Sequence, residues 1–282
     1  MEAVGEEVVV VRVRLRFAKL GRVRFTSHRD VVRMWERALR RARLPVVYTA
    51  GFSPRPKLSF GLALSTGHES LAEYLDVDLA GSAADDPAHE LTAAGAPDVA
   101  DLPERLSKEL PVGIDVLAAG FVQAGQVSLQ EAVRSCTWRI EALDLDPDAA
   151  EELVVAARSA ETLFVTRQRK GRDVTDDLRP AVLSVAVNGS TPVGTELEAE
   201  LAVHPRSVRP GELLRALAPG LEEGRVVRTA QWIWRDGERG EPLVAAADLD
   251  ATRAPHAPPR ASRRDQQHAR TRTRSPDAGL HQ

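Results

Sequence analysis

The sequence predicts an α+β protein made of two ferredoxin-like split βαβ halves with antiparallel sheets. Three observations support this fold class: the chain reads as strand, helix, strand, strand and a later helix, the same order then recurs, and the apolar pattern fades from about residue 236. We therefore expect an N-terminal half at residues 8–120, a C-terminal half at 134–236 and a disordered tail at 237–282. No clear sequence repeat relates the halves, so their similarity rests on element order.

The first half opens with an arginine-rich strand. In residues 8–17, apolar side chains alternate with arginines: Val11, Val13, Leu15 and Phe17 against Arg12, Arg14 and Arg16. This period of two is typical of a half-buried strand. Gly21 indicates a tight turn, and the alternation resumes over residues 22–25. We therefore expect a short return strand that places Arg22 and Arg24 on the same side as the first three arginines.

A helix follows the return strand. Ser27 is a favourable N-cap, and Asp30 stands at the spacing of a capping box. Apolar residues then recur at helical spacing: Val31, Trp35, Ala38, Leu39 and Ala42. Four arginines lie largely off that stripe: Arg33, Arg37, Arg40 and Arg41. Pro45 ends the helix.

The segment Gly51–Lys57 predicts a stiff loop, because Pro54 and Pro56 fix φ and hold the residues before them in extended geometry. The remaining strands of this half are expected at residues 46–48, 58–64, 73–79 and 114–117. A helix within residues 91–110 should be interrupted by Pro97 and Pro103.

The second half repeats the pattern. Strands are expected at residues 137–143, 163–167, 181–187, 197–203 and 226–234, and helices at 148–160 and 210–217. Residues 167–179 predict a hairpin with a basic tip. Residues 251–282 hold almost no large apolar side chains, so they cannot bury enough surface to offset the entropy of ordering.

Composition excludes several kinds of site. The single cysteine, Cys136, excludes an intramolecular disulfide, a Cys-only zinc site and an iron–sulfur cluster held by this chain alone. We expect no metal and no cofactor, and the common phosphate-loop, metalloprotease and nucleophile-elbow motifs are absent. No apolar run is long enough to span a membrane, and the acidic start is unlike a signal peptide, so the cytoplasm is the expected compartment.

Charge is distributed unevenly along the chain. Residues 1–60 hold 12 Arg and 2 Lys against 5 acidic residues, a balance of +9, although the whole chain carries −3. The remaining residues therefore carry −12. A basic block within an acidic protein favours an anionic partner, and we expect that partner to be RNA.

Two groups of candidate RNA-binding residues come from the opening hairpin and the helix start. Arg14, Arg16, Arg22 and Arg24 should share one side of the hairpin, where an anion would relieve their mutual repulsion. A solvated sheet face is the alternative. His28 stands at the first helical position beside free N–H groups, where it can meet a phosphate or act as an acid or base. An ordinary surface histidine would show the same pattern.

The third group lies in the Gly51–Lys57 loop. Arg55 and Lys57 are presented with little entropy left to lose, which suits phosphate binding. Phe52 can stack on a base. The alternative is a rigid turn with Phe52 in the core.

Several motifs together are specific, although none is so alone. They are Phe25-Thr26-Ser27-His28-Arg29-Asp30, Arg40-Arg41-Ala42 with Leu44-Pro45, Gly51-Phe52-Ser53-Pro54-Arg55-Pro56-Lys57, and Gly67-His68-Glu69-Ser70 with Glu73-Tyr74-Leu75-Asp76. In this combination the chain resembles the radical SAM-linked protein family, a domain fused behind a radical SAM domain or encoded separately. Weaker similarity extends over about residues 9–235. Arg29 replaces a usual apolar residue, and Ser53 a usual Asn.

The resemblance implies an accessory domain that recognises the substrate of radical SAM chemistry. Relatives encoded near ribonuclease and ribosomal-protein genes point to RNA, either tRNA or rRNA. This chain lacks the CxxxCxxC motif, so a separate radical SAM enzyme would carry the cluster. Our leading hypothesis is a non-catalytic RNA-recognition or adaptor protein acting in RNA modification or processing. The alternatives are an RNA-processing or RNA-modifying enzyme that uses His28 as acid or base, and a protein-interaction module without nucleic acid.

Overall fold

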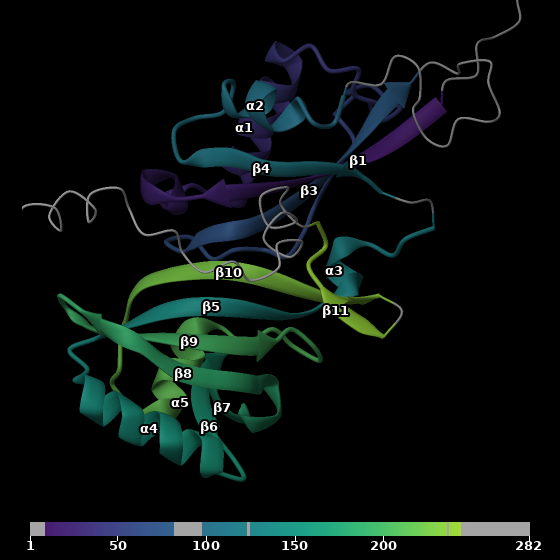
Figure 1. Cartoon of the computed structure of the whole chain (residues 1–282). Helices are drawn as coiled ribbons and strands as arrows, with labels where there is room; N and C mark the ends of the chain where they lie inside the picture. The colour runs from purple at the N-terminus through teal and green to yellow at the C-terminus, as the bar shows by residue number, and fades with distance from the viewer. Residues whose placement is uncertain (1–8, 82–97, 123–124, 236, 244–282) are drawn as a thin grey trace, which may run out of the picture. The chain divides into compact units, whose positions relative to one another are not determined.

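The structure is a computed structural model whose described residues are 9–81, 98–122, 125–235 and 237–243. These residues all fall within one compact unit, Met1–Ala245. They form an α+β fold that consists mostly of strands, with few helices (Figure 1).

The N-terminal part of the sheet is built around its first strand. Its elements are β1 (Val9–Lys19), α1 (His28–Arg41), β2 (Leu58–Phe60), β3 (Glu69–Gly81), α2 (Leu102–Ser107) and β4 (Ile114–Phe121). β1 lies between β3 and β4 and is antiparallel to both. β2 pairs antiparallel with β3 and thereby extends the sheet beyond it.

One face of this part of the sheet packs against α1 and α2. On β1 that face carries Val13, Leu15 and Phe17, each 1% exposed. Trp35 of α1 is fully buried, and its ring meets that of Phe17 edge to face with centroids 5.0 Å apart. Because burying a large apolar side chain stabilises a fold by about 1.5–3 kcal/mol, this contact holds α1 on the sheet. Val13, Leu15 and Phe17 therefore belong to the core.

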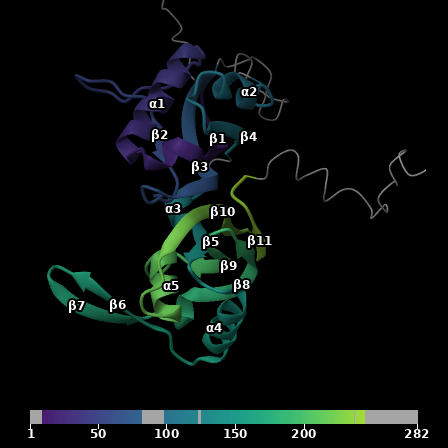
Figure 2. The same ribbon diagram turned by 90° about the vertical axis from the view of Figure 1, so that its left-hand side faces the viewer.

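The C-terminal part repeats this arrangement around β5. Its elements are β5 (Val133–Leu143), α4 (Pro147–Ser159), β6 (Phe164–Arg169), β7 (Arg172–Asp177), β8 (Val182–Thr191), β9 (Gly194–Ala202), α5 (Pro210–Leu217) and β10 (Glu223–Arg235). β5 lies between β9 and β10 and is antiparallel to both, and β8 pairs antiparallel with β9. A second apolar core lies among these strands, α4 and α5. The β6–β7 hairpin is a separate sheet and projects away from the main one (Figure 2).

The two parts join into one nine-stranded sheet with the order β4-β1-β3-β10-β5-β9-β8, to which β2 and the short β11 (Glu238–Gly240) add at the side. β3 and β10 are parallel and pair at only two positions, Glu69 with Val227 and Ser70 with Arg228. The mixed sheet therefore depends on side chains as well as backbone pairing at this junction. Three further short elements are η1 (Gly21–Phe25), α3 (Leu129–Ala132) and η2 (Arg179–Ala181).

Buried charged side chains connect β3 with β10. The Glu69 carboxylate accepts hydrogen bonds from the Gly21 N–H at 2.7 Å and from Arg225 Nε at 2.7 Å, and it lies 3.3 Å from Arg24 Nη1. Arg228 is 1% exposed and donates from Nη2 to the Leu62 carbonyl at 3.0 Å and to the Glu73 carboxylate. Since a buried charge without a partner is strongly destabilising, these pairs fix the junction.

The return strand predicted over residues 22–25 is wrong. These residues form the 3-10 helix η1, in which Gly21 has φ +68° and the Leu20 N–H donates to the Gly113 carbonyl at 2.7 Å. The physical reason is that both edges of β1 are already paired, with β3 and β4, so no edge is left for a returning strand. Arg22 and Arg24 therefore do not share the face of β1.

Other elements follow the sequence more closely. Ser27 caps α1 as predicted, since its Oγ accepts the Asp30 N–H at 3.3 Å. Pro103 lies in the first turn of α2 and does not interrupt it, because a first-turn residue needs no N–H partner. The strand predicted at 58–64 ends at Phe60. Residues 91–97 of the predicted helix lie outside the described residues.

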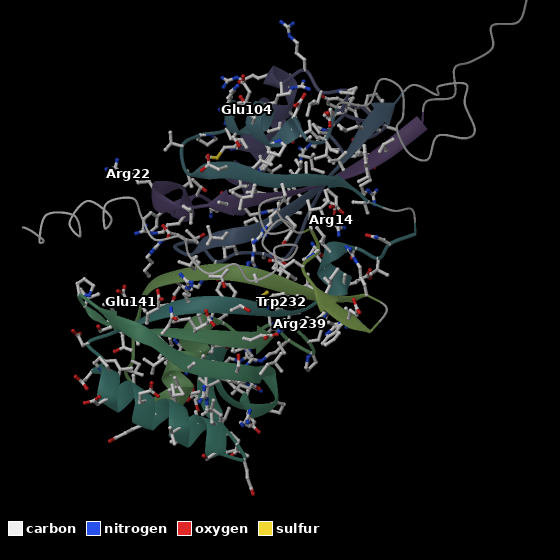
Figure 3. All side chains as sticks on the ribbon, viewed as in Figure 1. Arg14, Arg22, Glu104, Glu141, Trp232 and Arg239 are labelled. Carbon is white, nitrogen blue, oxygen red and sulfur yellow. The ribbon has the colours of Figure 1, made fainter. Side chains whose placement is uncertain are left out.

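The tail predicted from residue 237 begins too early. β11 pairs antiparallel with the end of β10, and Arg239 stacks on the Trp232 ring with its guanidinium carbon 3.8 Å from the centroid (Figure 3). The backbone pairing of β11 and the stacking of Arg239 on Trp232 hold residues in place that composition alone assigns to the tail. Residues 244–282 lie outside the described part of the chain. Within the described ranges, no helix is both long and apolar enough to cross a membrane.

The junction should make stability depend on pH through Glu69. Burial alone would raise the pKa of this carboxyl, but the Gly21 N–H, Arg225 and Arg24 together hold the pKa below its usual value. The contribution of Glu69 to the free energy of unfolding is therefore complete above the unfolded pKa of about 4.3. This contribution is lost as the pH falls through the lower pKa of the folded state. We expect Glu69→Gln to lower the urea-unfolding free energy at pH 7, and the difference from wild type to shrink in acid.

A matched control is Glu104→Gln, because Glu104 is exposed and pairs with Lys108 on the surface of α2. Its effect should be much smaller at every pH. A Glu69→Gln difference that stays constant from pH 7 to pH 3 would contradict the role assigned to this carboxylate.

Candidate nucleic-acid interface

The arginines of β1 are paired with carboxylates of β3. The register sets Arg14 directly opposite Asp76 and Arg12 opposite Asp78. Arg14 donates from Nε and Nη2 to the two Asp76 oxygens at 2.7 and 2.9 Å, and Arg12 meets Asp78 in the same way at 2.7 and 3.2 Å. Arg14 is 4% exposed, so its pair is buried.

Arg16 is also buried, at 8% exposure. Its Nη1 lies 2.9 Å from the Glu241 carboxylate, and its Nε donates to the Leu71 carbonyl at 3.3 Å. The segment after β11 thus reaches this face of the sheet, where Leu243 packs near Tyr74 and Leu129. The alternative of a solvated sheet face is therefore wrong for Arg14 and Arg16, and their burial also keeps both side chains from the surface at which RNA was expected to bind.

The two η1 arginines have different surroundings. Arg22 is exposed and projects outward from the ribbon, whereas Arg14 lies among the strands (Figure 3). Arg24 is half-buried, pairs with Glu69 and stacks on the Phe25 ring with its guanidinium carbon 4.5 Å from the centroid. The structure therefore assigns Arg24 to the β3–β10 junction and leaves Arg22 exposed.

His28 is the first residue of α1 and is exposed. Its ring meets that of Phe60 edge to face, with centroids 5.1 Å apart. Its ring nitrogens make no hydrogen bond to another residue in the described ranges. His28 also lines a cavity of about 30 Å³ that has Lys19 and Glu73 in its wall. Burial lowers the pKa of Lys19 there, although Glu73 opposes the shift.

Several exposed arginines gather on the outer side of α1. A pocket of about 380 Å³ lies between this helix and the segment that contains the Gly51–Lys57 loop. Among the described residues, its basic side chains are Arg29, Arg33, Arg40 and Arg55, its carboxylate is Glu36, and Val32, Tyr48, Pro54 and Pro56 complete its walls. We name this set the basic pocket.

Helical spacing explains why three of these arginines share the pocket. Arg29 and Arg33 are one turn apart, and Arg40 lies two turns beyond Arg33 on the same side of α1. From Arg29 to Arg40 the helix rises about 16 Å, so their charges follow its length. The buried side of α1 holds Trp35 and Leu39, which forces the arginines outward.

The loop is braced by its own backbone. The Thr49 N–H donates to the Arg55 carbonyl at 2.8 Å, and the Arg55 N–H donates to Thr49 Oγ1 at 3.1 Å. Gly51 adopts φ +127°, a conformation that side-chain-bearing residues avoid. Phe52 is fully exposed at 111%, so the alternative that placed it in the core is wrong. The loop therefore holds Arg55 against α1 and presents Phe52 to solvent.

Few carboxylates neutralise the basic pocket. The side chains of Arg29, Arg40 and Arg55 form no ion pair or hydrogen bond with another described residue. Arg33 lies 3.6 Å from Asp30, and both side chains are about half exposed. Such a surface pair is weak, with a median near 0–1 kcal/mol. The predicted residue Lys57 is exposed but does not line the pocket.

In the C-terminal part of the sheet, the side of β9 that faces away from the core is acidic. The residues of β9 that alternate with its core residues are Glu196, Glu198 and Glu200. Glu198 lies opposite Arg139 of β5. Acidic groups therefore dominate that part of β9, which disfavours a polyanion there.

Sequence comparison places this arrangement in a family. A family model described as "Uncharacterized protein conserved in bacteria (DUF2344)" matches residues 12–210. The chain belongs to the DUF2344 family. The match runs from β1 to the first residue of α5, so this DUF2344 chain carries the whole basic pocket within its family region. No curated protein matched the chain.

Sequence reasoning found part of the pocket and missed the rest. The stiff loop indicates Arg55, which lines the pocket, and Phe52, which does not. In the sequence, Arg29, Arg33 and Arg40 stand out only as residues off the apolar stripe or as a family departure. Their spacing of four and seven positions was a readable signal. The sequence does not indicate that the Gly51–Lys57 loop lies beside this side of α1.

The buried pair of β1 and β3 yields a stability prediction. Asp76→Ala leaves Arg14 buried without its counter-charge, which should cost about 3–5 kcal/mol in the free energy of unfolding. The double variant Arg14→Met/Asp76→Leu removes both charges and should recover most of that loss. Urea unfolding of the three proteins measures both effects. Equal losses for the single and double variants would contradict a paired, buried Arg14.

Proposed function

We propose that this DUF2344 chain is a non-catalytic protein that binds single-stranded RNA through the basic pocket. The observation that carries this conclusion is the convergence of four arginines and one carboxylate on one exposed pocket. Guanidinium groups bind phosphate oxygens through paired N–H donors, and they act most strongly when no carboxylate of the protein competes.

Aromatic residues beside the arginines favour an unpaired strand. Tyr48 lines the pocket and is 47% exposed, and Phe52 is fully exposed at the tip of the same loop. Each stacked base adds about 1–3 kcal/mol to binding. Bases in a duplex already stack on one another. The rings of Tyr48 and Phe52 can therefore stack only on bases that are splayed out of a helix. The stiff loop lowers the entropy lost on binding.

The enzyme alternative has less support. His28 does not line the basic pocket, and Arg55 and His28 share no contact in the described residues. A general acid or base needs to reach the proton that it transfers within about 2.6–3.2 Å. We therefore assign Arg29, Arg33, Arg40 and Arg55 to phosphate contact and leave the reaction to another protein.

The resemblance to the radical SAM-linked family supplies the partner in this proposal. We infer that the chain presents tRNA or rRNA to a separate radical SAM enzyme. We also infer that the two parts of the sheet are two ferredoxin-like units, since each has a central strand flanked antiparallel on both sides and helices in the same two connections. Tagged protein purified from its native host without RNase should carry such an enzyme, and recovery of no iron–sulfur partner would count against the adaptor role.

Two adjacent arginines of α1 give a matched test of RNA binding. Arg40 lines the basic pocket, whereas Arg41 lines a different pocket beside Lys108 and Glu109. Both are exposed in the last helical turn, so replacing either with Glu has a similar effect on helix stability. We expect Arg40→Glu to weaken binding of single-stranded RNA about tenfold or more, and Arg41→Glu to change it by no more than about twofold.

Fluorescence anisotropy with labelled RNA at several salt concentrations measures both variants. Wild-type affinity should fall with salt, and Arg40→Glu should reduce the slope of log K against log salt by about 0.7 for each lost phosphate contact. Equal effects of Arg40→Glu and Arg41→Glu would reject the pocket as the binding surface.

A further inference from the structure

A second pocket lies away from α1, where the start of β3 meets α5 and the start of β10. Its volume is about 560 Å³, within the range of small-molecule sites. Its polar side chains include Ser65, Thr66, His68, Arg209, Arg215 and Glu222. None of these residues lines the basic pocket.

His68 in its wall is not explained by packing alone. It is 7% exposed, and its Nε2 lies 2.9 Å from Glu223 Oε1. The ring also meets Trp138 edge to face, with centroids 6.1 Å apart. Its Nδ1 is buried and has no hydrogen-bond partner among the described residues. Because an unsatisfied buried polar atom is costly, such a group is more frequent at functional sites than in inert cores.

Glu223 holds His68 in place. The hydrogen bond from His68 lowers the pKa of Glu223, and the Gly211 N–H at the start of α5 and the nearby Arg215 add to the shift, against burial. A Cβ at position 211 would stand 2.8 Å from Glu223 Oε2, so glycine leaves room for the carboxylate. Glu223 therefore remains ionised and orients the imidazole.

The pocket keeps two cations that the protein does not neutralise by direct pairing. Arg209 and Arg215 are exposed, and neither guanidinium forms an ion pair within the described ranges. Glu212 also lines the pocket but is already paired with Arg206 at 2.9 Å. Glu222 is the carboxylate that lacks such a partner among the residues described. Glu223 keeps its charge as well, so Arg209 and Arg215 share the pocket with two carboxylates that pair with no arginine or lysine in the described part of the chain. Both guanidinium groups remain open to an anion, and the carboxylates are left to accept hydrogen bonds.

We propose that this pocket binds a phosphate monoester that carries hydroxyl groups. Arg209 and Arg215 contact the phosphate, whose three terminal oxygens match two forked guanidinium groups better than a carboxylate would. Ser65 and Thr66 donate further hydrogen bonds from the rim. Glu222 accepts hydrogen bonds from the ligand's hydroxyl groups. The volume exceeds that of a free phosphate ion, which is why a larger phosphorylated molecule is needed.

Two kinds of ligand carry such a phosphate monoester beside hydroxyl groups: a small sugar phosphate and the 5′-phosphate end of an RNA strand. The site does not depend on RNA binding by the basic pocket, because the two pockets share no residue. Variants of one pocket can therefore be used to test the other.

The test follows the His68 ring by NMR during titration with ribose 5-phosphate. The chain has 7 histidines, and the His68 signal is identified by its loss in His68→Gln. We expect a saturable shift of the His68 ring in wild type and in Arg40→Glu. Arg209→Gln/Arg215→Gln should weaken the response about tenfold or more. An unsaturated drift, or a response that is unchanged in the double variant, overturns the proposal.

Two further measurements complete the test. The double variant should lose little of the wild-type melting temperature, because both arginines are exposed and form no ion pair within the described residues. Arg215 acts on Glu223 only through space. In the Arg40→Glu background, 5′-phosphorylated and 5′-hydroxyl RNA oligomers separate the two sources of the phosphate. A His68 response only to the phosphorylated oligomer assigns the pocket to RNA ends, and no response to either oligomer or to ribose 5-phosphate rejects the site.

Discussion

Arg12 and Arg14 of β1 lie directly opposite Asp78 and Asp76 of β3, and the N-terminal half is arranged around these two ion pairs. Opposite charges facing each other across two strands stabilise the pairing, whereas like charges would weaken it. The pairs also determine how the half uses its positive charge. Arg14 is buried in its ion pair with Asp76 and is not available to a ligand. Alternation along β1 alone predicts that its side chain faces away from the core.

The arginines on the outer side of α1 take no part in these ion pairs and are exposed. The helix is fixed on the sheet by Trp35 and Phe17, so its arginines can only face away from the core. The Gly51–Lys57 loop then lies beside them and adds Arg55. The basic block thus consists of a buried, paired set on the sheet and an exposed set on α1 that is available for the proposed RNA binding. RNA binding, if carried by the second set, does not disturb the first.

The sequence showed most of the elements but little of their pairing. Period-two alternation located β1, and the Ser27 cap located the start of α1. Alternation failed at residues 22–25, because a local pattern cannot reveal that both edges of β1 are occupied. Asp76 and Asp78 alternate with core residues just as Arg12 and Arg14 do. Their complementarity was visible, yet only the register between β1 and β3 converts it into ion pairs.

The candidate sites were harder to predict for the same reason. Arg55 and Phe52 were identifiable from the stiff loop, since prolines set its geometry locally. The basic pocket joins α1 to the segment that follows it, whereas the second pocket joins segments far apart in the chain. His68 and Glu223 are 155 residues apart and meet only because β3 and β10 are neighbours in the sheet. No sequence spacing could have indicated that contact.

Photo-crosslinking of single-stranded RNA that contains 4-thiouridine, followed by mass spectrometry of the crosslinked peptides, tests the central claim most directly. We predict crosslinks on the peptides that cover Arg29–Arg40 and Tyr48–Arg55, with Phe52 and Tyr48 as the principal sites. Crosslinks that instead concentrate on β1 or on β9, with none on α1 or the loop, would contradict the division between structural and binding arginines.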